Sequence, residues 1–562
     1  MDTVHTPAVA HLTTLIDDFL ADFFDFYPIV ASKLGLHDYD GRITNLDQSA
    51  IDARVERLRM YDQRLSEIDL ASLDRMQAFD YRLLRWRIDA ELWSWLEDRE
   101  YQRNPMIYTY NLMVDTYIKR DYAPLEDRAQ SLVQHLHQIP AAMQVARQNL
   151  KPGLPQALIE EALAIFSGLV TFFTYSLPEA FGRGQAETPL NHRPELERDL
   201  WVAFDVAIAA MNDLSSYLRE ELLPTANPNF ALGSEQYQAM LKYNELIDIP
   251  LDQLLELGRA DLARNQAALA EVVQQIDPSV SIMEHIDALH QHHPPAERLL
   301  EETRTMLHNL RSFIIERDLV TLPCNGEGLL VEETPPFERW AFAMMDTAGP
   351  FETQASESYY YITLPEPDWS AEQVEAWLSR FDYATLTDIS IHEAYPGHFV
   401  HFVGMNNLSS RLARVFSAYS HYESWAHYAE QMMLEQGYGA GNLQLRLAQL
   451  TEALLRDCRY ICSIMMHTQG MSIDEATHFF IEQAYMDETS ARLEARRGTH
   501  DPGYLNYTLG KLLLLKLLED YRAAYGDNFS LKRFHDEYIG YGAPPIPILR
   551  SMLLPNDNGT LI

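Results

Sequence analysis

The stretch Asp388-Ile-Ser-Ile-His-Glu-Ala-Tyr-Pro-Gly-His-Phe-Val-His401 decides how the rest of this chain is interpreted. It holds a His-Glu pair, His392 and Glu393, and then a second histidine, His398. In the H-E-x-x-H motif, two histidines one turn apart bind zinc and the glutamate acts as general base. Here the second histidine comes six residues after the first, and six residues turn a helix by about 600°, which leaves the side chains about 120° apart. An unbroken helix would not bring both histidines to one ion.

Pro396-Gly397 stands inside this motif and changes that expectation. Proline removes a helix hydrogen bond and clashes with the preceding turn, while glycine permits unusual dihedral angles. We therefore interpret the stretch as H-E-x-x-H with a two-residue insertion that bulges or unwinds the helix. Such a bulge turns His398 back toward His392, and the pattern predicts a metal site. The alternative is that both histidines only cap or fill a helix break.

A third ligand is expected from a nearby antiparallel helix, because hydrolytic zinc sites use three protein ligands and leave a fourth position to water. The segment Ala418-Tyr-Ser-His-Tyr-Glu-Ser-Trp-Ala-His-Tyr-Ala-Glu430 offers Glu423, 25 residues after His398. Glu430 lies two turns further on, roughly on the same face. An amphipathic helix with exposed acids is the alternative, and the histidine motif favours the ligand role.

These two segments resemble the bacterial proteins catalogued as domain-of-unknown-function family 885. That family carries H-E-x-x-P-G-H and a downstream E-G-W-A-x-Y-A-E helix, which correspond to residues 392–398 and 423–430 here. The resemblance covers most of the chain. The supporting phrases are Leu34-Gly-Leu-His-Asp-Tyr-Asp-Gly41, Thr334-Pro-Pro-Phe337, Pro350-Phe-Glu352, Tyr359-Tyr-Tyr361 and Asp501-Pro-Gly-Tyr-Leu-Asn-Tyr-Thr-Leu-Gly-Lys511.

The family is placed with the gluzincin metallopeptidases, and the resemblance implies a zincin-like fold with a metal site. It implies a mostly helical Zn²⁺-dependent hydrolase that acts on peptides. The metal ligands would be His392, His398 and Glu423, and Glu393 would be the general base.

The chain departs from the family pattern at three positions. Ser424 stands where the family has Gly, His401 where a Gln is common, and His427 where an apolar residue is usual. Serine inside a helix is tolerable. His401 and His427 could contact the ligand side chains or replace one of the ligands, so their role stays open.

A metal hydrolase also needs a hydrogen-bond donor for the oxyanion of the tetrahedral intermediate. Tyr504 and Tyr507 are the candidates, and Tyr507 matches the family position better. Pro502-Gly503 would begin their helix with its N-terminus directed inward, where negative charge is favoured.

Candidate substrate contacts lie in two further segments. Arg492, Arg496 and Arg497 form a basic cluster that could clamp a substrate carboxylate, although each could instead pair with a surface acid. The β-rich stretch Ser356-Glu-Ser-Tyr-Tyr-Tyr-Ile-Thr-Leu364 includes Tyr360 and could add a substrate backbone by edge pairing.

The rest of the chain predicts a mainly α fold. Residues 12–26 and 51–100 carry apolar residues at helical spacing, and helical patterns fill most of the chain. Between about residues 318 and 369 the composition indicates a small sheet of two to four short strands beside the metal-site helices. We predict one body with two lobes around a single cleft, a helical lobe at residues 1–315 and a catalytic lobe at residues 316–562.

Charge excludes some partners. The 562 residues carry 44 Lys and Arg against 82 Asp and Glu, a formal charge of −38. Phosphate backbones and anionic membranes attract basic proteins, so we expect neither nucleic acid nor a membrane surface as partner. The longest run free of charge and histidine, residues 162–178, is short for a membrane span, and we expect a buried helix there.

The three cysteines, Cys324, Cys458 and Cys462, cannot form a disulfide framework. This count and the absence of a signal-peptide pattern predict a cytoplasmic protein. The oligomeric state stays open, with a homo-oligomer as one option.

We predict a zinc-dependent hydrolase that cleaves peptide bonds, with a peptide as substrate and Zn²⁺ as cofactor. One alternative keeps the site but hydrolyses small non-peptide amides. Another is a non-catalytic helical protein with a structural metal site, closed by a fourth ligand such as His401, His421 or His427.

Overall fold

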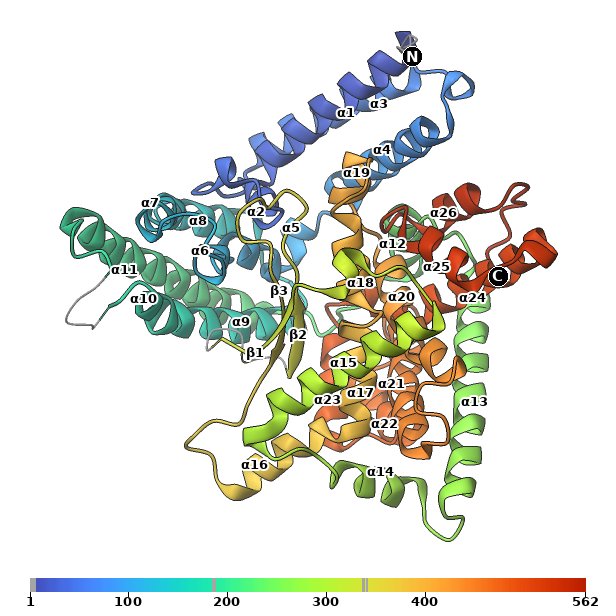
Figure 1. Ribbon diagram of the computed structural model, residues 1–562. Coiled ribbons are helices and arrows are strands. Elements are labelled where there is room, and N and C mark those ends of the chain that lie inside the picture. The colour runs from blue at the N-terminus through green and yellow to red at the C-terminus, as the bar shows by residue number, and fades with distance from the viewer. Residues whose placement is uncertain (1–6, 184–188, 336–338, 340–341) are drawn as a thin grey trace. The chain divides into compact units, whose positions relative to one another are not determined.

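The computed structural model describes residues 7–183, 189–335, 339 and 342–562, and the chain divides into two compact units (Figure 1). Unit 1 comprises Met1–Phe230 and Ala348–Ser356, and unit 2 comprises Ala231–Thr347 and Glu357–Ile562. The predicted boundary near residue 315 therefore differs from this division, which places residues 231–315 in unit 2.

The helices of unit 1 are α1 (Pro7–Phe26), α2 (Pro28–Lys33), α3 (Gln48–Ser66), α4 (Arg75–Trp93), α5 (Glu100–Arg103), α6 (Thr116–Lys119), α7 (Leu125–Leu136), α8 (Ile139–Asn149), α9 (Gln156–Thr174), α10 (Ser176–Ala180) and α11 (Pro194–Tyr217). The helical pattern of the sequence predicts these elements, and proline marks the start of several of them. Pro140, for example, lies in the first turn of α8, where its missing N–H has no helical partner to lose.

The long uncharged run forms α9 and α10. The segment Gln156–Ala180 is long and apolar enough to cross a membrane by length and composition, and 28% of its most apolar window is buried. The buried side chains of α9, among them Leu158, Ala162 and Phe166, follow one face of the helix. The buried helix expected here is therefore buried along one face only.

Two sequence phrases that lie far apart in the chain meet in unit 1. The Phe351 amide donates to the Leu34 carbonyl at 2.9 Å, and His37 Nε2 lies 2.9 Å from Glu352 Oε2. The His37 ring also stacks on Tyr122 at 3.5 Å. The phrase at residues 34–41 thus anchors the segment at residues 348–356. Of the phrase at residues 334–337, Pro336 and Phe337 lie outside the described residues.

The helices of unit 2 are α12 (Ser234–Glu245), α13 (Leu251–Ile276), α14 (Ile282–His290), α15 (Leu299–Arg317), α16 (Ala371–Leu378), α17 (Tyr383–Glu393), α18 (His398–Met405), α19 (Arg411–Val415), α20 (Tyr419–Glu435), α21 (Leu443–Thr468), α22 (Ile473–Ala484), α23 (Glu488–Arg497), α24 (Asn506–Tyr525), α25 (Leu531–Ile539) and α26 (Ile546–Leu553).

Close packing of α13 on α21 explains why the division falls before α12. Any side chain at Gly258 of α13 would overlap the Tyr460 ring of α21, so the glycine sets the helix spacing. The Tyr460 hydroxyl donates to the Leu254 carbonyl at 2.8 Å, and Asn265 donates to Asp457 at 2.7 Å. Because these contacts are buried, α13 belongs with the C-terminal helices.

The predicted small sheet is present in unit 2 as three strands, β1 (Leu329–Glu333), β2 (Ala343–Asp346) and β3 (Ser358–Ile362). The order is β1-β3-β2, with β3 parallel to β1 and antiparallel to β2. Figure 1 shows β3 between the other two strands. Both edges of β3 are already paired, so the expectation that this strand adds a substrate backbone by edge pairing is wrong.

The core of unit 2 lies between this sheet and the helices that carry the histidine motif. It includes Val331 and Tyr360 of the sheet, Leu386 of α17, Trp425 of α20 and Leu514 of α24, each at most 4% exposed. The helices α17 and α20 therefore approach each other over a packed apolar layer. This layer fixes the direction in which their polar side chains point.

Candidate metal centre

The helix α17 begins at a buried cap and ends within the His-Glu motif. Asp382 accepts hydrogen bonds from the amides of Ala384 and Thr385 at 3.0 and 2.9 Å, which satisfies two unpaired N–H groups at the helix start. The helix stops at Glu393, directly after His392. The motif histidine therefore lies in the last turn of a helix whose start is fixed.

The Pro-Gly insertion ends this helix, as the sequence predicts. The Tyr395–Pro396 bond is cis, and α18 starts at His398 after the break. The Gly397 amide donates to the Ile391 carbonyl at 3.0 Å, and a methyl group on Gly397 would overlap the His392 carbonyl oxygen. Only glycine allows the chain to fold back this tightly on the end of α17.

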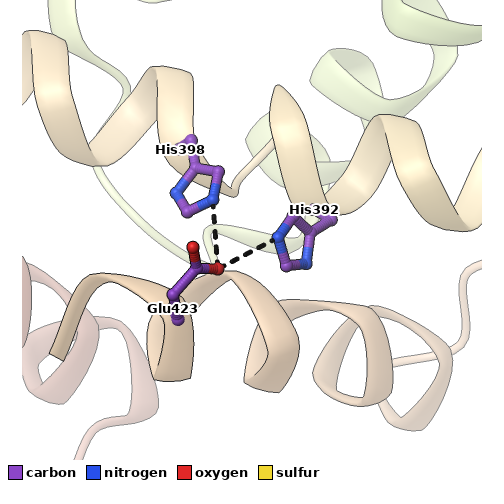
Figure 2. Close-up of side chains that lie close together, drawn as sticks. All are labelled: His392, His398 and Glu423. Atoms are coloured by element: carbon purple, nitrogen blue, oxygen red, sulfur yellow. Dashed lines mark ion pairs between the residues drawn. The ribbon is translucent and has the colours of Figure 1, made fainter. Parts of the chain in front are cut away.

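This fold-back brings the two histidines together. Their rings lie 4.8 Å apart at 89°, although they belong to different helices. Glu423 of α20 faces both of them, as Figure 2 shows. Its Oε2 lies 3.4 Å from His392 Nε2 and 3.5 Å from His398 Nε2. The three side chains predicted as ligands thus converge, and each is buried.

The spacing of these atoms suits a metal better than a hydrogen-bonded cluster. Ligand atoms about 2.1 Å from a tetrahedral zinc are about 3.4 Å from one another. Glu423 Oε2 and His398 Nδ1 are buried and have no hydrogen-bond partner among the described residues. A buried carboxylate oxygen without a partner is costly, and a cation bound between the three groups would remove that cost. The residues present therefore fit a zinc ion.

Glu430 holds the ring nitrogen of His392 that does not face Glu423. Its Oε1 lies 2.6 Å from His392 Nδ1, and its side chain is fully buried. This contact leaves Nε2 of the histidine directed at Glu423. Carboxylates often hold the second ring nitrogen of a metal-binding histidine in this way. The sequence placed Glu430 on the Glu423 face but assigned it no role.

Further charged groups neutralise Glu430. Arg456 Nη2 lies 3.1 Å from its Oε1, and His427 Nδ1 donates to its Oε2 at 2.9 Å. Lys511 in turn lies 3.4 Å from His427 Nε2. His427, whose role the sequence left open, therefore lies behind the ligand cluster. A chain of buried polar groups from α20, α21 and α24 supports one metal-ligand candidate.

The pKa shifts follow from this arrangement. Burial lowers the pKa of His392, but the nearby Glu423 carboxylate and the contact with Glu430 outweigh it and raise the pKa to about 10. Burial also opposes ionisation of Glu423, yet His398 and His392 hold its pKa below the ordinary value. Without metal, the cluster thus keeps an anionic carboxylate beside a protonated ring. A cation would take the place of that proton.

Asp388 lies one turn before His392 on α17 and is also buried. Burial raises its pKa well above the ordinary value, and the charge of Glu430 adds to this effect. Its Oδ1 has no hydrogen-bond partner among the described residues. The sequence offered no signal for this group, because its neighbours come from other helices.

The other histidines near the motif point elsewhere. His401 is fully buried and its Nε2 lies 3.0 Å from the Gly542 carbonyl, and His421 Nδ1 lies 2.7 Å from that of Pro544. Burial lowers the pKa of His401 to about 4. Among the described residues, the group of side chains able to hold a metal contains neither of them nor His427.

The two candidate oxyanion donors lie in different parts of unit 2. The Tyr507 ring lies 6.4 Å from the His392 ring and remains partly exposed, and burial followed by the charge of Glu423 raises its pKa. Tyr504 is fully buried in the short turn before α24, with its hydroxyl packed against Gly498. The structure therefore places Tyr507 beside His392, in the cluster of candidate ligands, and Tyr504 in the core. The expectation for Tyr504 as a donor is corrected accordingly.

The three arginines of α23 also differ in position and exposure. Five residues turn a helix by about 500°, so Arg492 and Arg497 lie on different faces. Arg492 is 55% exposed and pairs with Asp474 at 3.0 Å, away from the cluster. Arg497 donates to Tyr419, a neighbour of Tyr507, at 3.3 Å. Arg496 is partly buried. A substrate contact through Arg492 is therefore not supported.

Tyr360, the fourth candidate for a substrate contact, lies inside the core. Its side chain is 0% exposed, and its hydroxyl lies 3.3 Å from Ser390 Oγ. The expectation of a substrate contact through this residue is wrong, because a central strand presents alternate side chains to the packed helices.

Glu245, which the sequence did not indicate, caps the helix that carries Glu423. It accepts from the amides of Tyr419 and Ser420 at 3.2 and 3.1 Å, and from the Ser420 hydroxyl at 2.6 Å. The carboxyl is buried, and burial raises its pKa to about 7 despite these hydrogen bonds.

The close approach at Gly397 gives the first prediction. Gly397→Ala would push a methyl group into the His392 carbonyl, and we expect a loss of about 3 kcal/mol or more in the free energy of unfolding. Gly404→Ala in α18 is the control, because a methyl group there meets no atom within 4 Å. We expect this control to gain about 0.5–1 kcal/mol. Urea denaturation measures both, and an unchanged midpoint for Gly397→Ala would contradict the geometry.

The buried Glu245 carboxyl gives a pH dependence. Its pKa rises from 4.5 to about 7 on folding, so its contribution to stability is full below pH 4.5 and is lost as pH rises through 7. Between pH 5 and 8 this loss amounts to about 2–3 kcal/mol. Glu245→Gln should lack that part of the wild-type decline in urea denaturation.

Glu235→Gln is the matched control for that experiment, because it changes an exposed carboxyl on the same helix. We expect it to follow the wild-type pH dependence. If Glu245→Gln declines as steeply as the wild type, the buried carboxyl does not titrate as inferred.

Comparison with known proteins gives a family and a fold. A candidate lipoprotein of unknown function from Shewanella oneidensis is 24% identical with a TM-score of 0.80, covering 98% of this chain and 100% of that chain. A candidate lipoprotein from Colwellia psychrerythraea is 18% identical with a TM-score of 0.82, covering 98% and 99%. These identities show the fold alone, and no curated protein matches. The family model for bacterial proteins of unknown function, DUF885, matches residues 28–553, and the chain therefore belongs to this family.

Proposed function

We propose that this protein is a zinc-dependent hydrolase of the gluzincin type that cleaves peptide bonds in short peptides. The observation that carries the proposal is the convergence of His392, His398 and Glu423, with the Glu423 oxygen 3.4 and 3.5 Å from the two histidine nitrogens. This spacing supports tetrahedral zinc. The zinc would polarise the peptide carbonyl and lower the pKa of a bound water toward about 7.

Glu393 is the group best suited to move the proton. It follows His392 directly, and its side chain is partly exposed. It takes a proton from the attacking water and passes it to the leaving amine, so that one water and one peptide bond yield a carboxylic acid and an amine. Tyr507 donates its hydroxyl hydrogen bond to the developing oxyanion.

A set of three candidate ligands would favour catalysis over a structural metal. A structural zinc site is closed by four protein ligands. Within the part of the chain that the structure describes, the metal-binding group consists of three residues, and His401, His421 and His427 face other partners. Hydrolysis of small non-peptide amides by the same residues is the second candidate, since the amide chemistry is the same.

The cellular compartment stays a prediction. The composition favours the cytoplasm, while the two structural neighbours are described as candidate lipoproteins. Fractionation of cells followed by detection of the native protein decides between the cytoplasm and the cell envelope.

Glu393→Gln tests the mechanism. We expect purified wild-type protein to hold about one zinc ion per chain and to cleave peptides from a short-peptide library. The variant should keep the zinc and lose cleavage by about 10²–10⁴-fold, because the general base is removed. Metal analysis and mass spectrometry of the products measure both. Wild-type rates in the variant would exclude this role for Glu393.

Glu430→Gln tests the support of His392. The variant keeps the size of the side chain but removes the charge that holds Nδ1, and we expect zinc affinity to fall by about 10–100-fold. Competition with a chelator measures this affinity without relying on activity. Glu435→Gln, an exposed change on the same helix, should leave it unchanged. Equal affinities in both variants would show that Glu430 does not support the ligand.

A further inference from the structure

We propose that the site recognises the free C-terminal carboxylate of a short peptide, and that Arg497 binds this carboxylate. The inference rests on the proposed function and names its substrate class. It also selects one arginine from the cluster that the sequence indicated.

An aromatic rim borders the metal cluster. The Phe402 ring stacks on His398 at 5.2 Å, and Tyr422 lies 6.1 Å from the same ring. The Tyr507 ring contacts His392, and Tyr419 lies 5.7 Å from Tyr507. All four rim residues are partly exposed. They offer a substrate apolar surface and hydroxyl groups but no charge.

Arg497 places a positive charge at the end of this rim. Its Nη2 donates to the Tyr419 hydroxyl at 3.3 Å, and its Nε and Nη2 donate to Asp501 Oδ2 at 3.0 and 2.9 Å. Its side chain is 32% exposed. Asp501 and Tyr419 therefore hold the guanidinium in place from one side.

The other side of the guanidinium remains available. Nη1 of Arg497 makes no hydrogen bond with any residue that the structure describes, and a charged N–H group binds a carboxylate oxygen strongly. Both N–H groups of Nη2 already donate to Asp501 and Tyr419, so a substrate carboxylate would accept from the N–H groups of Nη1. The geometry thus suits an anion that binds at Nη1.

The other arginines around Tyr507 also pair with acids, as Arg497 does, but they are more deeply buried. Arg459 pairs with both oxygens of Glu494 at 2.7 Å, and Arg456 pairs with Glu430 and Glu452 at 3.1 and 3.0 Å. Both are at most 11% exposed. Of these three arginines, Arg497 alone has both exposure and an uncommitted nitrogen.

The charge of Arg497 and its position relative to His392 agree with binding of a substrate carboxylate. In a chain of net charge −38, a local positive group gives an anion a reason to bind at this position. Two contacting aromatic rings separate Arg497 from His392. Because an extended residue spans at most about 3.6 Å, a short peptide reaches from the metal cluster to the arginine.

Calorimetric titration tests the inference without requiring turnover. The probes are two tripeptides, Phe-Ala-Phe with a free carboxylate and the same peptide with a C-terminal carboxamide, added to zinc-loaded Glu393→Gln protein. We expect the free acid to bind at least about 10-fold more tightly. Adding Arg497→Ala should remove this preference and leave the amide affinity unchanged, and Arg497→Lys should restore part of it.

Arg492→Ala is the matched control, because it removes an exposed arginine from the same helix. We expect it to keep the preference. Equal binding of acid and amide, or an equal loss of both in Arg497→Ala, overturns the inference.

Cleavage assays with the wild type separate the two proposals. Equal kcat/KM for acid and amide means that the hydrolase proposal stands and the carboxylate inference falls. Acid-selective, Arg497-dependent binding without any cleavage means that the binding site stands and the hydrolase proposal falls.

Discussion

The short contact between Glu430 and His392 is the interaction on which the candidate site depends. A buried carboxylate is stable only if its charge is compensated, and Glu430 is compensated by His392, Arg456 and His427 together. These partners come from α17, α21 and α20, so satisfying one charge fixes three helices. The orientation of His392 Nε2 toward Glu423 follows from the same constraint.

The second constraint is steric and acts on the backbone. Because Gly397 folds against the His392 carbonyl, the chain leaves α17 and starts α18 after the short turn at residues 394–397. The result brings together two histidines that an unbroken helix would hold apart. Both constraints thus act on His392. The carboxylate of Glu430 on α20 orients its side chain, and the tight turn at Gly397 packs against its backbone.

Much of this could be predicted from sequence, because it depends on local rules. Helical spacing predicts the helices, and β-rich composition predicts the small sheet. The Pro-Gly pair predicts the break after His392, and the spacing to Glu423 predicts a third group on a neighbouring helix. The division after residue 230 was not predictable in this way, since it depends on Gly258 of α13 packing against Tyr460 of α21.

The sequence by itself determined the candidate ligands, the candidate general base and the helical fold class, because these follow from residue type and near spacing. The tertiary structure decided the rest. It placed Tyr507 beside His392 and Tyr504 in the core, brought Arg497 and not Arg492 to Tyr419, and buried Tyr360 in a central strand. These outcomes depend on which face of each element packs against partners distant in sequence, and no local pattern encodes that choice.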